Sequence, residues 1–375
     1  MTGKNSSVLS GVLEASSPSS DASRRPSTID NKLKQSEAKM LHAIQYRQFF
    51  AAGLNTITTV GTANGTKNVA NKEIMVLVHG FAGGLAGWAQ NWEALSKDFE
   101  LFAIDLPGSG RSIRPNVSVK SPEDVLDFVT QCLDSWFEAM KFDKPVILLG
   151  HSFGAYLVSH YAVRRGPSRV RLLICADPWG VSRESPYNLK SMPLRYKLGL
   201  KAFNALNPFG LLRVLGPVAP RVMRLLRPDF AAKWSDSLPD PNVFYDYIYY
   251  CNVQTPPLGE TLFKACCTDV VGAKIPLEKV LPRDLSRDVP LALLYGSHTW
   301  MNAECGFTMA GEMTSKGYLV VADTIENAGH QVFTDNRDEF NEKLQMVCRA
   351  LLEGHSKSYV APNNALLPPE AGVVE

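Results

Sequence analysis

Short apolar runs separated by helix-compatible stretches dominate the chain between residues 74 and 176. The runs are Ile74–Val78, Leu101–Ile104, Val146–Leu149 and Leu172–Ala176, and each is followed by a Gly, Asp or Pro turn. They do not alternate between polar and apolar residues, as strands of a sheet with one solvent-exposed face would. Continuous apolar runs are typical of parallel strands that are covered on both faces. The pattern therefore predicts an α/β fold with a mostly parallel central sheet flanked by helices.

The two ends of the chain lack any periodic apolar pattern. Residues 1–35 and 356–375 are rich in polar, small and Pro residues, so we expect disordered tails there. Lys39–Phe50 carries apolar residues at helical spacing and is predicted to be a short amphipathic helix. A membrane-surface helix is the alternative for this segment.

The later part of the chain adds two strands and a helix. Leu291–Tyr295 and Tyr318–Val321 are predicted strands, and Asp335–Leu352 is a predicted helix. About 110 residues separate the first of these strands from the preceding one, far more than an ordinary connection. Apolar and basic residues alternate there at helical spacing, which indicates a helical cap over the carboxyl edge of the sheet. The predicted organisation is tail 1–35, core 36–177, cap 178–289, core 290–355 and tail 356–375.

Composition and charge narrow the classes of function. The 39 Lys and Arg residues nearly balance the 37 Asp and Glu residues, so no global field attracts nucleic acid. Seven scattered cysteines without C-x-x-C spacing exclude a paired zinc or redox motif and indicate reduced thiols in a cytoplasmic protein. No run reaches the ~18–20 apolar residues of a membrane span, and no secretory signal pattern is visible. Membrane contact is expected to be peripheral, and no cofactor or metal is implied.

Residues 150–154 read G-H-S-F-G, a G-x-S-x-G motif between a predicted strand and a predicted helix. In this setting the motif forms a sharp turn that exposes the serine at a helix N-terminus. Ser152 is therefore the candidate nucleophile. Without catalysis, the same motif would be a tight turn in which Ser152 merely caps the helix.

A nucleophilic serine needs donors for the oxyanion of the tetrahedral intermediate, and the glycine-rich loop after Ile74–Val78 can supply one of them. The backbone N–H groups of Phe81 and Phe153 are predicted to form this oxyanion hole. Gly80 and Ala82, in the same loop, are predicted to contact the substrate. His79 is interpreted as a histidine that stabilises the turn.

The general base should follow the last strand, because the usual chain order is nucleophile, acid, histidine. His330 is the histidine in that position. The acid is less clear, because Asn302 stands where a carboxylate is expected. Asp177 at the end of the preceding strand is our first choice, and Glu304 is a second. In the third alternative, Asn302 itself orients a neutral imidazole.

The sequence resembles the α/β-hydrolase domain-containing proteins 4 and 5, which include lipid hydrolases and a lipid-droplet lipase co-activator. The resemblance spans roughly residues 37–349 and extends into the cap. Its motifs are His79-Gly80-Phe81 with Trp88, Asp105 to Ser112, Gly150 to Gly154, Asp177-Pro178-Trp179-Gly180, Asn207-Pro208-Phe209, Leu226 to Phe230, and Tyr250 to Pro256.

The resemblance implies an α/β-hydrolase fold and glycerophospholipids or lysophospholipids as substrate class, with Trp179 at the acyl ligand. Ser152 is kept, as in the members similar to N-acyl-phosphatidylethanolamine and lysophospholipid hydrolases, whereas the co-activator looks to have Asn there. Family members generally have Asp at the position of Asn302. His330 and Asp335 also match the family's H-x-x-x-x-D pattern, linked to acyl transfer onto lysophosphatidic acid. Apart from that role, Asp335 is expected to cap the following helix.

The predicted cap is strongly basic. Residues 183–233 contain ten basic and two acidic residues, which favours either anionic lipid headgroups or an ordinary solvated surface. Two hypotheses follow. The first is a serine-dependent lipid acyl hydrolase with a further acyltransferase activity, peripherally bound to lipid droplets or to intracellular membranes such as those of mitochondria. The second is a non-catalytic, lipid-droplet-associated co-activator that binds a partner lipase.

Overall fold

The central sheet has eight strands. The computed structural model describes residues 27–61, 72–183, 209–268 and 271–353. The strands are β1 (Arg47–Ala51), β2 (Leu54–Thr58), β3 (Glu73–Val78), β4 (Phe99–Ile104), β5 (Val146–His151), β6 (Val170–Ala176), β7 (Leu291–Gly296) and β8 (Val320–Ile325). Their order is β1-β2-β4-β3-β5-β6-β7-β8, antiparallel in the first two pairings and parallel from β4 to β8. The prediction of a mostly parallel α/β sheet is confirmed.

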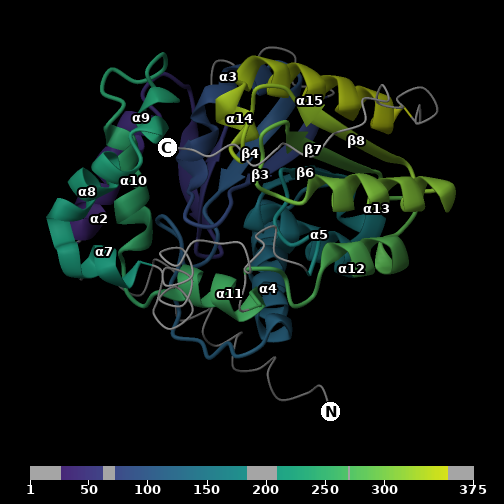
Figure 1. The fold of residues 1–375 in the computed structure, drawn as a ribbon, viewed down its shortest axis with the longest axis horizontal. Helices are drawn as coiled ribbons and strands as arrows, with labels where there is room; N and C mark the ends of the chain where they lie inside the picture. Colours follow the sequence, from purple (N-terminus) through teal and green to yellow (C-terminus); the bar gives the residue numbers. More distant parts are fainter. Residues whose placement is uncertain (1–26, 62–71, 184–208, 269–270, 354–375) are drawn as a thin grey trace, which may run out of the picture.

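Helices cover both faces of this sheet (Figure 1). One apolar core forms against α4 (Pro122–Met140), α5 (Phe153–Arg165), α12 (Leu277–Asp284) and α13 (Ala303–Ser315). The core of the opposite face includes α3 (Ala89–Ser96), α14 (Val332–Asp335) and α15 (Arg337–Leu352). Strands β3 to β7 are almost completely buried, which explains why their sequences are continuous apolar runs.

The N-terminal helix lies earlier than the sequence pattern suggested. Helix α2 spans Thr28–Met40, and the capping box of Ser27 and Asp30 fixes its start. The predicted tail 1–35 is therefore wrong for its last residues, and the predicted helix Lys39–Phe50 is wrong beyond Leu41. The many polar residues on the exposed face of α2 made its apolar periodicity weak in the sequence, although Leu33 and Met40 are buried on its other face.

A β-hairpin replaces the second half of that predicted helix. Strands β1 and β2 are joined by Ala52 and Gly53, which both have positive φ, the conformation of a tight two-residue hairpin turn. Phe50 is exposed on the edge strand, so its apolar character does not mark a buried helix face. The predicted strand Tyr318–Val321 is also shifted, to Val320–Ile325, while the tail 356–375 lies outside the described residues.

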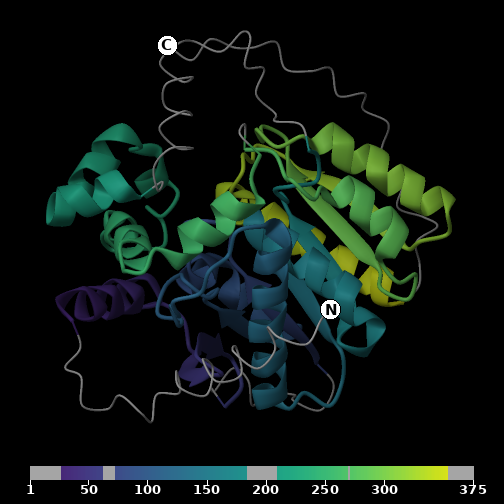
Figure 2. The same cartoon turned by 90° about the horizontal axis from the view of Figure 1, so that it is seen from below.

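The connection from β6 to β7 is helical where it is described. It contains α7 (Gly210–Leu215), α8 (Ala219–Leu226), α9 (Asp229–Ala232), α10 (Val243–Asn252), α11 (Leu258–Cys266) and α12. Helices α7 to α10 gather at one side of the molecule, with α2 packed along α10 (Figures 1 and 2). Helix α12 instead packs on α5 and α13 of the core. None of the described helices is long and apolar enough to cross a bilayer.

The sheet brings the ends of three neighbouring strands together. His151 at the end of β5 is paired with Ala176 at the end of β6. The backbone N–H of Ser152 donates to the Ala176 carbonyl at 3.1 Å, and the N–H of Asp177 donates to the Leu294 carbonyl of β7 at 2.7 Å. The residues that follow these strands therefore meet at one edge of the sheet.

Candidate active site

Ser152 sits in a strained turn between β5 and α5. Its φ and ψ are 51° and −119°, a combination that non-glycine residues rarely adopt. Two glycines allow this turn to pack closely. A Cβ at Gly150 would lie 2.5 Å from the Ala155 Cα, and one at Gly154 would lie 2.3 Å from the His79 carbonyl oxygen. The G-x-S-x-G spacing is thus required by backbone contacts on both sides of the serine.

Three side chains form a continuous line of hydrogen bonds. The Ser152 Oγ lies 2.9 Å from His330 Nε2, and His330 Nδ1 lies 2.6 Å from Asp177 Oδ2. With Nδ1 protonated toward Asp177, Nε2 is free to accept the hydroxyl proton. This is the geometry of a nucleophile, a base and an orienting acid. The structure therefore brings together Ser152, His330 and the first of the three alternatives for the acid.

Asp177 is completely buried and fully occupied by donors. Its carboxylate accepts from the Gly296 N–H at 3.1 Å and from the Thr299 Oγ1 at 2.6 Å, in addition to His330. Asp177 has φ of 44°, so its backbone turns sharply at the end of β6. Thr299 belongs to the loop after β7 in which the acid was first sought. That loop supplies a hydroxyl donor to Asp177 instead of a carboxylate.

The other two alternatives for the acid lie elsewhere. Asn302 is the N-cap of α13, and its Oδ1 accepts from the Cys305 N–H at 3.0 Å. Glu304 is in the first turn of the same helix. Both line a surface groove of about 380 Å³ together with Glu278 and Lys279 of α12. The alternative in which Asn302 orients His330 is wrong, because the Asn302 side chain caps the N-terminus of α13 instead.

The loop after β3 lies directly against the serine. A Cβ at Gly80 would be 2.9 Å from the Ser152 Cβ. The ring of Phe81 stacks on Phe263 of α11, with centroids 4.2 Å apart. Ala82 has φ of 64°, and its carbonyl accepts from the Asn252 side chain of α10 at 2.9 Å. Cap helices thus hold the loop in which Phe81 is an expected oxyanion donor.

Trp179 and Phe153 belong to an aromatic cluster beneath the site. The Trp179 ring packs against Phe153, Tyr156 and Phe263, and its indole N–H donates to the Val271 carbonyl at 2.8 Å. Trp179 is only 3% exposed. The structure therefore assigns it a packing role, while the backbone of Phe153 begins α5 immediately after Ser152.

His79 holds the turn before that loop. Its Nδ1 donates to the Gly80 carbonyl at 2.7 Å, and its Nε2 accepts from the Leu106 N–H at 3.0 Å. Burial lowers the pKa of His79 from its usual 6.5 to about 4, so the ring is neutral at physiological pH. The interpretation of His79 as a turn-stabilising residue is confirmed.

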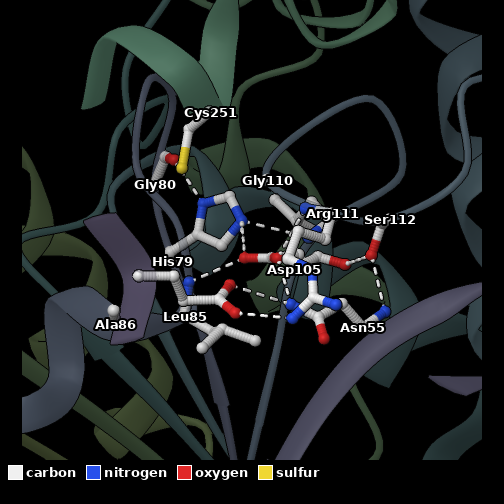
Figure 3. A network of polar contacts seen from close by, with 12 residues as sticks. Asn55, His79, Gly80, Leu85, Ala86, Asp105, Gly110, Arg111, Ser112 and Cys251 are labelled. Atoms are coloured by element: carbon white, nitrogen blue, oxygen red, sulfur yellow. Dashed lines mark hydrogen bonds and ion pairs between the residues drawn. The ribbon is translucent and has the colours of Figure 1, made fainter. Parts of the chain in front are cut away.

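A buried polar network contacts the loop that follows β3 (Figure 3). Asp105, directly after β4, accepts from the Leu85 N–H at 2.8 Å and from the Asn55 side chain at 2.7 Å. Asn55 also donates to Glu37 of α2 at 3.1 Å, and Arg111 forms an ion pair with Glu37 at 2.9 Å. Burial is the main cause that raises the pKa of both carboxyl groups.

Sequence reasoning missed His151, the variable residue of the G-x-S-x-G motif. Its Nε2 donates to the carbonyl oxygen of His330 at 2.8 Å, and the two rings lie 4.8 Å apart. Burial and then the neighbouring His330 hold the pKa of His151 well below its usual value. His151 therefore anchors the backbone of the candidate base, and the motif position next to Ser152 was the signal that could have found it.

Asp335 does not cap the final helix. Asn336 is the N-cap of α15, with its side chain accepting from the Glu339 N–H. Asp335 instead accepts from the Gly329 N–H at 2.9 Å and pairs with Lys233 at 2.5 Å. The expectation of a capping role is wrong. Within the described residues, no group of His, Cys, Asp and Glu side chains could hold a metal ion.

Comparison with known proteins finds similar sequences among the alpha/beta hydrolases. A profile described as "Alpha/beta hydrolase family" matches residues 75–343. The chain is 34% identical to 1-acylglycerol-3-phosphate O-acyltransferase ABHD5 of Rattus norvegicus, over 86% of this chain and 91% of that one. It is 33% identical to the (lyso)-N-acylphosphatidylethanolamine lipase of Mus musculus, over 86% and 93% of the two chains.

Solved structures share the fold at low sequence identity. The carboxylesterase CesB of Bacillus subtilis superimposes with a TM-score of 0.58 at 17% identity, covering 86% of this chain and 99% of that one. A bacterial membrane phospholipase A superimposes with a TM-score of 0.58 at 21% identity, covering 92% and 95%. These likenesses show the architecture alone.

Proposed function

Since this chain belongs to the alpha/beta hydrolase family, and within it to the group of ABHD5 and the (lyso)-N-acylphosphatidylethanolamine lipases, we propose that it is a serine-dependent lipid acyl hydrolase. The observation that carries this proposal is the line of hydrogen bonds from Ser152 through His330 to Asp177. Its substrates are lysophospholipids or N-acyl phospholipids, in keeping with the names of these relatives.

The proposed reaction begins with attack of the Ser152 Oγ on the acyl carbonyl. His330 Nε2 takes the hydroxyl proton, and the buried Asp177 carboxylate stabilises the resulting imidazolium. The N–H groups of Phe81 and Phe153 bind the oxyanion, because Phe153 begins α5 directly after Ser152 and Phe81 follows Gly80, which lies against Ser152. His330 then gives this proton to the leaving group. In the second half of the reaction, His330 takes a proton from water, the water attacks the acyl carbonyl, and His330 returns the proton to the Ser152 Oγ as the fatty acid leaves.

A narrow apolar cavity of about 10 Å³, room for roughly one water molecule, lies beside the loop that adjoins Ser152, so an acyl chain could enter only if this cavity widened. Phe81 and Phe153 line it together with Leu106, Val129 and Leu262. Gly80 lines it as well, which joins the cavity to the loop at Ser152. Apolar walls with donors at one end are the usual composition of a site for a fatty acyl group.

A membrane or lipid-droplet surface is the proposed location of the substrate. Helices α7 and α8 and the turn between them expose five large apolar side chains, each at least 50% accessible, which we call the cap face: Leu211, Val214, Val218, Leu225 and Leu226. Arg221 and Arg224 are exposed on the same helix α8. Apolar residues beside arginines fit an interface with anionic headgroups.

Other basic residues of the cap serve its own structure or lie outside the described residues. Arg213 pairs with Glu260 and also donates to the Val253 carbonyl. Arg227 pairs with Asp229, 2.8 Å away, and covers the ring of Phe230. Lys190, Arg195, Lys197 and Lys201 fall in the part of the chain that the structure does not describe. The proposed interface therefore rests on the cap face and on the two exposed arginines.

Labelling with an active-site fluorophosphonate tests the serine mechanism. The parent should be labelled at Ser152, and Ser152→Ala should lose both the label and hydrolysis of lysophosphatidylethanolamine by several orders of magnitude. Vesicle binding should persist in the variant, since only the nucleophile is removed. A parent protein that resists labelling while it stimulates a triacylglycerol lipase would instead establish the co-activator hypothesis.

A further inference from the structure

An ion pair links the cap to the loop that carries the candidate base. Lys233, directly after α9, lies with its Nζ 2.5 Å from the Oδ1 of Asp335 at the end of α14. The side chain of Asp335 is 9% exposed, and that of Lys233 is 23% exposed. A pair shielded from solvent to this degree is only weakly screened by salt and is worth more than an exposed pair.

The second oxygen of Asp335 acts on the histidine loop. Asp335 Oδ2 accepts from the backbone N–H of Gly329, the residue before His330, at 2.9 Å. The same carboxylate therefore binds the cap with one oxygen and the loop of His330 with the other. His330 has to remain between Ser152 and Asp177, whose contacts with it are 2.9 and 2.6 Å long.

Lys233 is itself held in place by the core. Its carbonyl accepts from the Gln90 side chain of α3 at 2.8 Å, and the same amide donates to Ser237 at 2.9 Å. Its ammonium group lies 5.5 Å from the ring centroid of Phe230. The charge of Lys233 also acts near the site, as a minor cause of the lowered pKa of His151 after burial and His330.

We propose that Lys233 and Asp335 are positioning residues that couple the cap helices to His330, an inference that rests on the proposed function. When the cap is docked, Lys233 fixes the Asp335 carboxylate, and this carboxylate fixes the Gly329–His330 backbone at the distance that proton transfer requires. The pair gives Asp335 of the H-x-x-x-x-D pattern a role in hydrolysis, distinct both from helix capping and from the acyl transfer with which the resemblance links that pattern.

Four variants test the coupling with p-nitrophenyl butyrate as a soluble ester. Lys233→Met and Asp335→Asn each remove the ion pair, while the Asn side chain can still accept from Gly329. Each should lower kcat by about 10- to 100-fold, because a small displacement of a catalytic group has an effect of that size. KM should change by less than about twofold, since the acyl cavity is untouched. Lys233→Arg should restore most of kcat.

The double variant Lys233→Met/Asp335→Asn should be no slower than the single variants, because all three lack the same interaction. The matched control is Lys316→Met, which removes the lysine of the exposed pair with Glu312 and should leave kcat unchanged. Losses that multiply in the double variant, or an unchanged kcat in Lys233→Met, would overturn the coupling. So would a loss of acyl transfer to lysophosphatidic acid in Asp335→Asn with normal hydrolysis.

Amide hydrogen exchange tests the coupling without any activity. Lys233→Met should exchange faster than the parent in residues 326–331 and 219–238, and Lys233→Arg should not. Equal exchange in parent and Lys233→Met would reject the coupling even if Ser152 proves catalytic. Conversely, faster exchange in a protein that fluorophosphonate does not label would support the coupling and reject the proposed function. If Asp335→Asn does not fold, the two Lys233 variants decide the question by themselves.

Discussion

Asp177 receives its donors from the end of β7, from the loop that follows β7 and from the candidate base, in a completely buried position. A buried carboxylate is stable there only because each of its oxygens is hydrogen-bonded. The Thr299 hydroxyl shares Oδ2 with His330, so it helps to fix the carboxylate plane that orients the ring. Asn302 has no comparable role, because its side chain starts α13.

Substitution of Asp177 should impair catalysis, whereas substitution of Asn302 should impair only stability. Asp177→Asn should lower kcat by about 10⁴-fold, because an amide favours the wrong imidazole tautomer and cannot stabilise the imidazolium. Asn302→Ala should leave kcat within about twofold but lower the free energy of unfolding by about 1 kcal/mol, the usual effect of a lost N-cap. Steady-state kinetics and urea denaturation measure both quantities, and the reverse ranking of kcat would return the acid to the loop after β7.

Helix α8 combines two features that are separable by mutation. Its exposed leucines, Leu225 and Leu226, provide apolar area, whereas Arg221 and Arg224 provide charge. Arg227 is unsuitable for such a test, because its carbonyl also accepts from the Tyr245 hydroxyl and its side chain pairs with Asp229. The helix can therefore be changed on its outer side without disturbing the contacts that hold the cap together.

Vesicle flotation should distinguish the two features. Arg221→Glu/Arg224→Glu should weaken binding to anionic vesicles at low salt by about 30-fold or more, since each of the two lost arginines contributes about 1 kcal/mol and each new carboxylate is repelled. Leu225→Ser/Leu226→Ser should weaken binding at both low and high salt, because apolar insertion is not screened. Met346→Ser, an exposed apolar residue of α15, is the matched control and should bind normally. Unchanged flotation in both cap variants would exclude this helix from the interface.

The molecule as a whole keeps several titratable groups uncharged in its interior. Burial lowers the pKa of His160 on α5 from 6.5 to about 4, as it does for His79. The unfolded chain then binds more protons than the folded chain between these values, so both histidines destabilise the fold as pH falls. Glu37 and Asp105 act in the opposite direction, because their raised pKa values favour the folded, protonated form in acid.

A histidine variant isolates one of these opposing effects. His160→Gln removes the titration, so its free energy of unfolding should improve relative to the parent by up to about 3 kcal/mol between pH 7 and pH 4. Chemical denaturation at several pH values measures this difference. His42→Gln, the same substitution at an exposed histidine, is the matched control. A parent-minus-variant difference that is constant with pH would show that His160 is protonated equally in both states.

The amino-acid sequence by itself determined the elements whose signals are local. The continuous apolar strands, the capped start of α4 at Ser121 and the elbow at Ser152 all depend on neighbours within a few residues. His330 followed from chain order alone. The hairpin of β1 and β2 and the start of α2 escaped prediction, because edge strands and exposed helix faces carry weak apolar patterns.

Only the tertiary structure decided the contacts between distant residues. Asp177 prevailed over Asn302 because β6 lies beside β7, which brings the Gly296 and Thr299 donors and His330 to one carboxylate. Lys233 meets Asp335 because the cap folds back on α14. The sequence named the chemical groups, but the pairing of β-strands and the docking of helices determine which of those groups come within hydrogen-bonding distance.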